Sequence, residues 1–561
     1  MVATRKILLL VLALAAVTMA VMTDDSDDSS AEVQTGTCGD VTFTFDIASG
    51  TLTVSGSGAM ADYSKSSPSG FEGYDIKTVA IESGVTHIGD YVFADCKSIA
   101  SVTIAGSVTS IGSNAFKSCH GLTSVTVPGS VKTLGAYAFG GCTNLTQINF
   151  YAENCGDLTE SSNVFYLAGT KGSGVTVTIG AAVNNVPNYL FYSCTSITSV
   201  DISVPVNSLG RYAFCGCSGL TSVTIPNSVT TIKDSVFQDC TSLGSVSIPD
   251  SVHVIGAYAF SGCNSLKNVT LGKNVDSIAS FAFSGCTALQ SITIPENVGT
   301  IARSLFEGCT SLESVTLPDS VSGYYNSVFK GCTSLKSVKI GDSVDTLPES
   351  LFEGCTALTD VDLGSSVKTI AASAFKGCAS LILVTIPDKV TSIGESAFEN
   401  CSGLASLTVP DSVTSVGRYA FKGCSALTAV TFNGVPGNIT AASLIFSNAG
   451  TSDDGITVTI GSSVTGIPDY LFYFSDSTDS ANIVSVVIGD NVKTIGEFAF
   501  YNCAGLRSVK MGGSVESVGQ SAFYGCSSLD TIVIPDTVTS VGKSAFYNCT
   551  SLGSAVIGSN V

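Results

Sequence analysis

A phenylalanine followed three residues later by a cysteine recurs through this chain at intervals of 23 residues. The interval holds without a slip over eleven successive phenylalanines: Phe191, Phe214, Phe237, Phe260, Phe283, Phe306, Phe329, Phe352, Phe375, Phe398 and Phe421. The same spacing opens the array at Phe93 and closes it at Phe546. A fixed period of this length is typical of a solenoid, in which each repeat is one coil stacked on its neighbours. We therefore expect a solenoid rather than the three or four globular domains that 561 residues would otherwise predict.

The coil between Cys217 and Cys240 shows how each repeat should fold. Its residues alternate so that Val223 and Ile225 face inward, while Ser222 and Thr224 face outward from a strand. Proline follows at position 226 and should end that strand because it has no N–H to donate.

The rest of the coil should supply the opposite wall and a turn. Val229 and Ile232 form a second inward pair. In most coils a glycine such as Gly256 follows, and we expect it to adopt positive φ before Ala259 and Phe260 fill the core. Each coil is thus predicted to have a strand on one face, a shorter extended segment on the other, and a tight helical turn around the phenylalanine.

Seventeen of the twenty cysteines occupy the same position in the repeat and should stack along the solenoid. Neighbouring strands lie about 4.8 Å apart, slightly beyond the Cβ separation of about 3.5–4.5 Å that a disulfide needs. We therefore predict a row of buried free thiols that act as small apolar fillers and weak S–H donors. Cys38, Cys155 and Cys215 fall outside this row.

The repeat resembles the BspA-like class of leucine-rich repeats, the type also found in treponemal surface proteins. The shared pattern is L-x-x-V-x-I-P-x-S-V-x-x-I-G-x-x-A-F-x-x-C, nearly complete from Leu404 to Cys424, and the resemblance covers roughly residues 76–561. It implies a leucine-rich repeat solenoid that is β-rich with short helical turns, elongated and curved, with about 20 coils of 23–28 residues. It also implies a secreted or surface-exposed binding protein, since some members of the family are adhesins that bind extracellular matrix proteins or other cells.

The N-terminal residues before the repeats divide into three segments. Residues 1–22 have a basic start and an apolar core, so they are predicted to be a signal peptide, with an uncleaved anchor as the alternative. The acidic, serine-rich residues 23–35 should be a solvated linker. Residues 36–75 resemble the segment that often precedes such arrays, and their alternating pattern predicts a β-hairpin that caps the first coil of the 76–561 solenoid.

The repeat is irregular in two similar stretches, about residues 150–190 and 432–499. There the interval lengthens around Phe165 and Phe446 and the cysteine is lost, which an internal duplication explains most simply. Protruding loops in these stretches are candidate contact sites, and tolerated insertions are the alternative. The sequence stops in mid-coil at Val561, so we expect either further sequence there or pairing of this end with another chain.

Several function classes find no support in the sequence. The three histidines occupy different repeat positions and form no recurrent cluster with Asp and Ser, and motifs of metalloproteases, serine hydrolases and phosphate-binding loops are absent. We therefore expect no enzyme, no cofactor and no metal site. The net charge of −20 without a basic patch argues against nucleic acid as a partner.

The outward positions of the longer strand are the candidate ligand-binding residues, expected on a concave face. Successive coils present Ser222, Thr224, Ser245, Ser247, Asn268, Thr270, Ser291, Thr293, Ser314, Thr316, Ser337 and Lys339. Such a row is typical of an exposed strand whose hydroxyls pair with neighbours, and it also suits an adhesive face that binds glycan or protein backbone.

Two hypotheses follow for function. The first is a secreted or cell-surface, non-enzymatic binding protein, an adhesin that recognises an extracellular protein or glycan, without membrane insertion apart from an N-terminal anchor. The second is a structural protein of an envelope or matrix that self-associates through its solenoid end.

Overall fold

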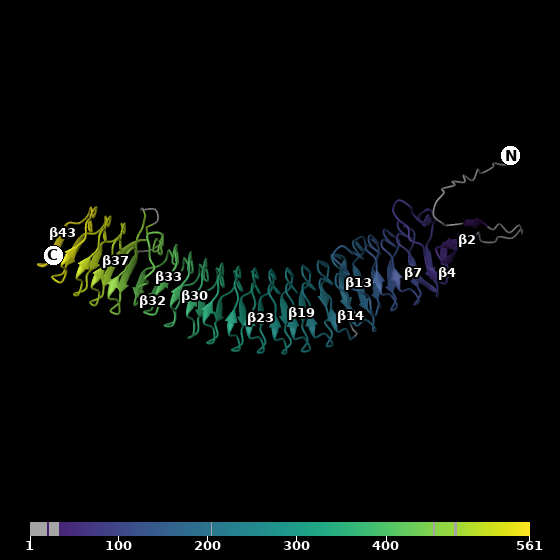
Figure 1. The fold of residues 1–561 in the computed structure, drawn as a ribbon, viewed down its shortest axis with the longest axis horizontal. Coiled ribbons are helices and arrows are strands. Elements are labelled where there is room, and N and C mark those ends of the chain that lie inside the picture. The colour runs from purple at the N-terminus through teal and green to yellow at the C-terminus, as the bar shows by residue number, and fades with distance from the viewer. Residues whose placement is uncertain (1–18, 22–32, 203–204, 453–454, 476–479) are drawn as a thin grey trace, which may run out of the picture. The chain divides into compact units, whose positions relative to one another are not determined.

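The computed structural model describes residues 19–21, 33–202, 205–452, 455–475 and 480–561. The chain forms two compact units, residues 1–229 and 230–561. The described residues wind into a β-solenoid of about 22 turns, with strands repeating from coil to coil (Figure 1). The predicted leucine-rich repeat solenoid is therefore confirmed. The predicted signal segment and acidic linker lie largely outside the described residues.

The first unit begins with antiparallel strands and continues as parallel coils. Its opening elements are β1 (Met19–Val21), β2 (Val33–Cys38), β3 (Val41–Asp46), β4 (Thr51–Gly56), β5 (Gly58–Ala59) and the 3₁₀ helix η1 (Phe71–Gly73). Its longer strands are then β6 (Thr78–Ile81), β8 (Ser101–Ile104), β10 (Ser124–Val127), β12 (Gln147–Phe150), β13 (Val175–Ile179), β15 (Ile197–Asp201) and β17 (Ser222–Val223). Its shorter strands are β7 (Val85–Ile88), β9 (Ser110–Ile111), β11 (Thr133–Leu134), β14 (Asn185–Val186) and β16 (Ser208–Leu209).

The second unit repeats the same two-walled coil. One wall carries β19 (Ser245–Ser247), β21 (Asn268–Thr270), β23 (Ser291–Thr293), β25 (Ser314–Thr316), β27 (Ser337–Lys339), β29 (Asp360–Asp362), β32 (Ser406–Val409), β34 (Ala429–Phe432), β35 (Ile456–Ile460), β37 (Ile483–Ile488), β39 (Ser508–Lys510), β41 (Thr531–Ile534) and β43 (Ser554–Ile557). The other carries β18 (Thr231–Ile232), β20 (Val254–Ile255), β22 (Ser277–Ile278), β24 (Thr300–Ile301), β26 (Gly323–Tyr324), β28 (Thr346–Leu347), β30 (Thr369–Ile370), β31 (Ser392–Ile393), β33 (Ser415–Val416), β36 (Gly466–Ile467), β38 (Thr494–Ile495), β40 (Ser517–Val518) and β42 (Ser540–Val541). We call the first of these two walls, which carries β19, β21 and the other longer strands up to β43, the long-strand face.

Neighbouring coils pair in parallel with a register of 23 residues, as the repeat predicts. Ser245 lies opposite Asn268, and Ser247 lies opposite Thr270. The alternation of side chains is also as predicted, because Val223 and Ile225 are buried between exposed Ser222 and Thr224. On the opposite wall Val229 and Ile232 are fully buried.

The repeated phenylalanines form a continuous stack inside each unit, which we call the phenylalanine spine. Its rings lie nearly parallel, as for Phe329 and Phe352, whose centroids are 5.5 Å apart with 4° between the planes. In the irregular coils Phe165 and Phe446 stay in the stack, at 5.4 Å and 5.3 Å from the preceding ring. The cysteine missing from these coils is replaced by buried Ala168 and Ala449. The longer intervals therefore leave the core of the coil intact.

The recurrent cysteines form a buried row beside the phenylalanine spine, which we call the thiol ladder. In most coils the Sγ donates a hydrogen bond to the carbonyl oxygen of a phenylalanine 26 residues earlier; Cys355 donates to Phe329 at 3.0 Å. Burial raises the pKa of Cys309 and of Cys355 to about 12. The predicted role of these residues as buried weak donors is confirmed.

The burial of these thiols predicts how they react with reagents in solution. A disulfide-exchange reagent such as dithionitrobenzoate at pH 8 should react with few thiols of the native chain, because the thiolate is the nucleophile and burial keeps these groups protonated. In denaturant without reductant close to all 20 cysteines should react. Few reactive thiols after denaturation would contradict the free-thiol interpretation.

The predicted helical turn around the phenylalanine is wrong. The only helix among the described residues is η1, and each coil instead forms consecutive tight turns. The backbone N–H groups of Phe260 and Gly262 donate to Ala282 and Ser284 of the next coil, both at 2.8 Å. The intervening Ser261 donates within its own coil to Tyr258 at 3.1 Å. Alternate amides are thus used between coils, which leaves them unable to form the i to i−4 bonds of a helix.

The predicted role of the recurrent glycine is also wrong. Gly256 has no positive φ; that conformation falls two residues later, at Tyr258 with φ 57°. A Cβ at Gly256 would lie 2.6 Å from the backbone nitrogen of Asp234 in the neighbouring coil. Glycine is therefore required there because two backbones approach closely.

At the N-terminus three antiparallel strands precede the coils. β2 pairs with β3 and β3 pairs with β4, while β4 pairs in parallel with β6. β2 begins at Val33, so residues 33–35 belong to a strand and not to the predicted linker, because their backbone pairs with residues 44–46. Phe43 packs edge-on against Phe71 at 5.1 Å, which connects these strands to the phenylalanine spine.

The two irregular stretches share one further feature. β13 and β35 each carry a bulge at the equivalent point, between Val175 and Thr176 and between Ile456 and Thr457. The likeness of the two stretches in sequence therefore extends to their backbones.

Candidate ligand-binding face

The structure exposes every one of the twelve residues predicted to bind ligand. Ser222 and Thr224 lie in the first unit, at and just after β17. The other ten lie in the second unit on five neighbouring strands, β19 to β27. Within that unit they form two rows on the long-strand face, because each strand contributes two outward residues at equivalent positions.

Hydroxyl groups at outward positions form hydrogen bonds with neighbouring side chains in some coils and not in others. In other coils they pair with neighbours, as Ser101 does with Thr78 at 3.2 Å and Ser508 with Ser485 at 3.1 Å. From β19 to β27, no side-chain hydrogen bond joins Ser245, Ser291 or Ser314 to another described residue. These side chains are therefore available to a ligand.

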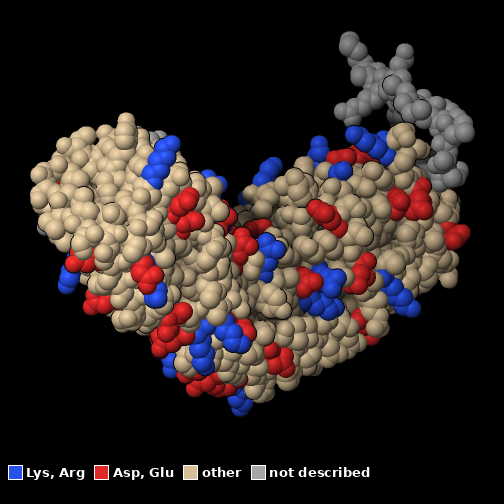
Figure 2. Space-filling model, turned by 60° about the vertical axis from the view of Figure 1, so that its left-hand side comes forward, with Lys and Arg blue, Asp and Glu red and all other residues tan. Residues whose placement is uncertain are grey.

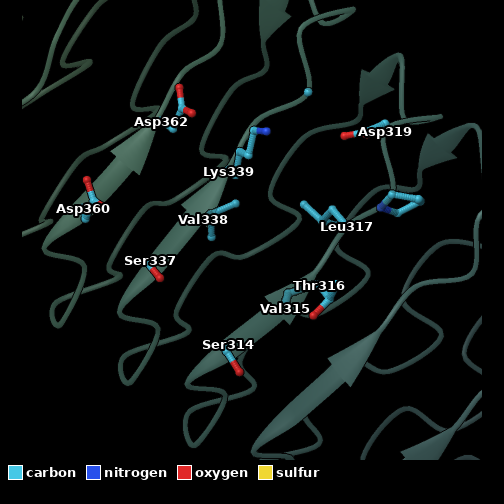
Figure 3. Close-up of a pocket in the computed structure, with 12 residues that line it drawn as sticks. Ser314, Val315, Thr316, Leu317, Asp319, Ser337, Val338, Lys339, Asp360 and Asp362 are labelled. Carbon is cyan, nitrogen blue, oxygen red and sulfur yellow. The ribbon is translucent and has the colours of Figure 1, made fainter.

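A hollow of about 400 Å³ lies on the long-strand face over β25, β27 and β29. Figure 3 shows Lys339 between Asp362 on one side and Leu317 and Asp319 on the other. Ser314, Thr316, Ser337 and Asp360 complete its polar lining. The hollow therefore combines four of the predicted residues with carboxylates that sequence analysis left out.

The missed carboxylates are Asp360 and Asp362 on β29. They stand directly opposite Ser337 and Lys339 in the parallel register. The same 23-residue step that placed the predicted residues leads to them, so the signal was present in the sequence. Asp362 accepts a hydrogen bond from the backbone N–H of Gly364 at 3.1 Å, which leaves most of its carboxylate exposed.

A second hollow of about 470 Å³ lies nearby, over β21 and β23. Its lining includes the predicted Thr270, Ser291 and Thr293, together with Lys273 and Glu296. Lys273 forms an ion pair with Asp250 at 3.3 Å, and its backbone N–H lowers the pKa of Asp250 below the usual value. In this hollow Lys273 is paired, whereas among the described residues no ion pair joins Lys339, Asp360 or Asp362 of the first hollow.

One of the three histidines lies in a group of polar residues. His87 contacts Ser110 through Nδ1 at 2.7 Å and Asp62 through Nε2 at 3.1 Å, so one histidine does lie with an Asp and a Ser. The backbone N–H of Asp90, and then His87, hold the pKa of Asp62 below its usual value. Asp62 stands 25 residues before His87, outside the 23-residue step, which hid the group from the periodicity.

This arrangement differs from the catalytic triad of serine hydrolases. In a triad Nε2 faces the serine and Nδ1 faces a buried aspartate. Here the two nitrogens are exchanged, and the side chain of Asp62 is 65% exposed. Ser110 also occupies a position that carries Ser or Thr in other short strands, such as Ser277 and Thr300.

Among the described residues, no group of three or more His, Cys, Asp and Glu is placed to hold a metal ion. In the same part of the chain, no helix has the length and apolarity to cross a bilayer. Acidic and basic side chains lie interspersed on the face seen in Figure 2, with broad areas free of both.

The fold and this face define a class of protein: a repeat solenoid that presents an extended, regular surface for binding. The sequence profile of the BspA type leucine rich repeat region matches residues 65–168, 161–244, 230–359, 346–479 and 478–561. The chain belongs to this family. No curated protein sequence matches it significantly.

Solved bacterial proteins are similar to the chain. A leucine-rich repeat protein from Bacteroides ovatus ATCC 8483 is 24% identical, with a TM-score of 0.39 over 77% of this chain and 86% of that one. One from Eubacterium ventriosum ATCC 27560 is 26% identical, with a TM-score of 0.35 over 64% and 93%. A leucine rich cell surface protein from Faecalibacterium prausnitzii A2-165 is 21% identical, with a TM-score of 0.24 over 95% of both chains. The family assignment rests on the repeat profile and not on these low TM-scores.

Proposed function

We propose that this chain is a secreted or cell-surface binding protein, an adhesin that recognises an extracellular protein or glycan through the long-strand face of its second unit. The observation that carries this proposal is the row of exposed side chains from β19 to β29, whose hydroxyl and charged groups are free for a ligand. Regular solenoid faces of this kind suit extended partners because many small contacts add over a long surface. Membership of the BspA-type family supports a surface location.

Arrays of extracellular matrix proteins and of glycans test the proposal. The full chain without residues 1–22, labelled and applied at micromolar concentration, should bind a restricted set of spots. Light scattering on the same sample should show a monomer, which separates ligand binding from self-association. Silence on both arrays would contradict an adhesin, and concentration-dependent assembly without a ligand would favour a structural protein instead.

The proposed function is non-enzymatic, and Ser110 offers a direct test. Because the serine faces Nδ1 and the aspartate is exposed, Ser110 should lack the activation of a catalytic nucleophile. We expect a fluorophosphonate probe to leave the intact mass of the chain unchanged while it labels a serine hydrolase in a parallel tube. A stoichiometric adduct on Ser110 that disappears in His87→Ala would contradict this prediction.

A further inference from the structure

At Ile382 and Leu383 the outward positions of the long-strand face carry aliphatic side chains instead of polar ones. The two residues are 60% and 59% exposed. The positions equivalent to Leu383 in the adjoining coils carry Asp360 and Ser406. A single exposed leucine is common on proteins. Two adjoining aliphatic side chains form a distinct surface feature here, because the two preceding coils carry Thr359 and Asp360, and Lys336 and Ser337, at these positions.

The pairing of strands is also interrupted at this point. The run of paired strands that includes β19 to β29 ends at β29, and the next sheet of the long-strand face begins at β32. Between them the described residues 382–386 form no strand, and a single bridge joins Leu383 to Ser406. The two aliphatic side chains therefore lie where the regular sheet stops.

Unpaired charges adjoin the aliphatic pair. Asp360 is one coil away from Leu383, and it lines the hollow with Asp319, Asp362 and Lys339. Among the described residues, no ion pair neutralises these four groups, although Lys336 on the same face pairs with Glu313 at 2.6 Å. Three carboxylates against one ammonium leave the hollow negative, in a chain whose net charge is −20.

We propose that this surface docks an extended segment of a partner protein that carries a large apolar side chain next to an arginine or lysine. We name it the Leu383 patch, and it comprises Ile382, Leu383, Asp360, Asp362 and Lys339. The proposal rests on the proposed function and specifies its partner. The apolar side chain covers Ile382 and Leu383, which removes their exposed surface from water.

The cationic side chain of the partner pairs with the carboxylates. Asp360 and Asp362 occupy successive outward positions on β29, about 7 Å apart at the usual rise of a strand. An arginine donates to such carboxylates in fixed geometry, and the negative field of the hollow steers it there. The lining of the hollow contains no aromatic ring, so the aliphatic and carboxylate groups favour a protein segment over a sugar.

An array of immobilised 12-residue peptides tests the Leu383 patch. Three sets with otherwise matched composition carry Arg next to Leu, Glu next to Leu, or Arg next to Ser. The full chain should bind the Arg–Leu set and discriminate against the other two. Raising the salt concentration should weaken this binding, because the charge pairs are exposed.

Two double variants test the aliphatic and the acidic residues of the Leu383 patch separately. Ile382→Thr with Leu383→Ser, and Asp360→Ser with Asp362→Thr, introduce residues that the repeat carries at these or similar positions elsewhere. Each should reduce affinity for the Arg–Leu peptides about 30-fold, the effect of losing a binding hot spot. Val533→Thr and Asp530→Ser are matched controls, and both variants should bind as the unmodified chain does. Val533 lies on β41 and is 56% exposed. Circular dichroism confirms that each variant is folded.

Several outcomes would overturn the Leu383 patch. These are no peptide binding, equal binding of the Glu–Leu set, or full affinity in both double variants. If the chain still binds a matrix protein or a glycan on the arrays described above, the proposed function survives while the patch fails. Silence on all arrays would overturn both.

Discussion

Replacing Phe352 by alanine should lower the free energy of unfolding by about 3–5 kcal/mol. The side chain is fully buried, and its ring stacks on Phe329 at 5.5 Å and on Phe375 at 5.3 Å. The stacked neighbours are held by their own coils, so they cannot move in to fill the space. Denaturant unfolding followed by circular dichroism measures the loss.

The loss should also be local. Each coil of a solenoid contacts only its neighbours, so hydrogen exchange should accelerate in the coils around Phe352 before it does elsewhere. Tyr325→Ala provides the control, because this aromatic residue lies in the adjacent coil and is 60% exposed. That variant should change stability by no more than about 0.5 kcal/mol. A similar small effect for Phe352→Ala would show that the phenylalanine spine is not the core.

The second large effect is loss of the fold at alkaline pH. Burial raises the pKa of Cys309 and Cys355 from the ordinary value near 9 to about 12. Below pH 9 these thiols are protonated in both states and have no effect. Between pH 9 and pH 12 the unfolded chain loses protons that the folded chain retains, so stability falls as pH rises. Each such thiol costs about 1.4 kcal/mol per pH unit in this window.

Because many thiols of the ladder share this environment, we expect unfolding between about pH 10 and pH 11, where several such losses exceed the typical stability of about 5–15 kcal/mol. The pH dependence of unfolding free energy near pH 10 gives the number of protons released. Cys309→Ala combined with Cys355→Ala should lower that number by about two. The comparison of slopes does not depend on any change in stability at neutral pH. An unchanged slope would show that these thiols do not control alkaline unfolding.

The interior of the coils could be predicted from the sequence because the 23-residue period determines which side chains stack and are buried. Once residues 23 apart stack, Phe260, Val223 and Ile232 have no place except the core. The turn was not predictable in the same way. Its conformation depends on hydrogen bonds such as that from Phe260 to Ala282, whose partner lies in another coil and leaves no mark on the local sequence.

The candidate site was predicted in part. Ser314, Thr316, Ser337 and Lys339 do line one hollow, but Asp360 and Asp362 were visible at the next step and were not included. The interruption at Leu383 depends on which strands pair, and that required the structure. The contact of His87 with Asp62 arises from an interval of 25 residues near the start of the solenoid, where periodicity no longer identifies neighbours.

The alternate donation of turn amides to the following coil has a consequence for how such a chain changes length. The backbone N–H of Gly262 donates to the carbonyl oxygen of Ser284, and one repeat later the N–H of Gly285 donates to the carbonyl oxygen of Glu307. Excision or duplication of one whole repeat in the gene therefore rejoins equivalent donors and acceptors. Recombination can thus lengthen or shorten the protein in whole repeats while each surviving coil keeps the same kind of neighbours.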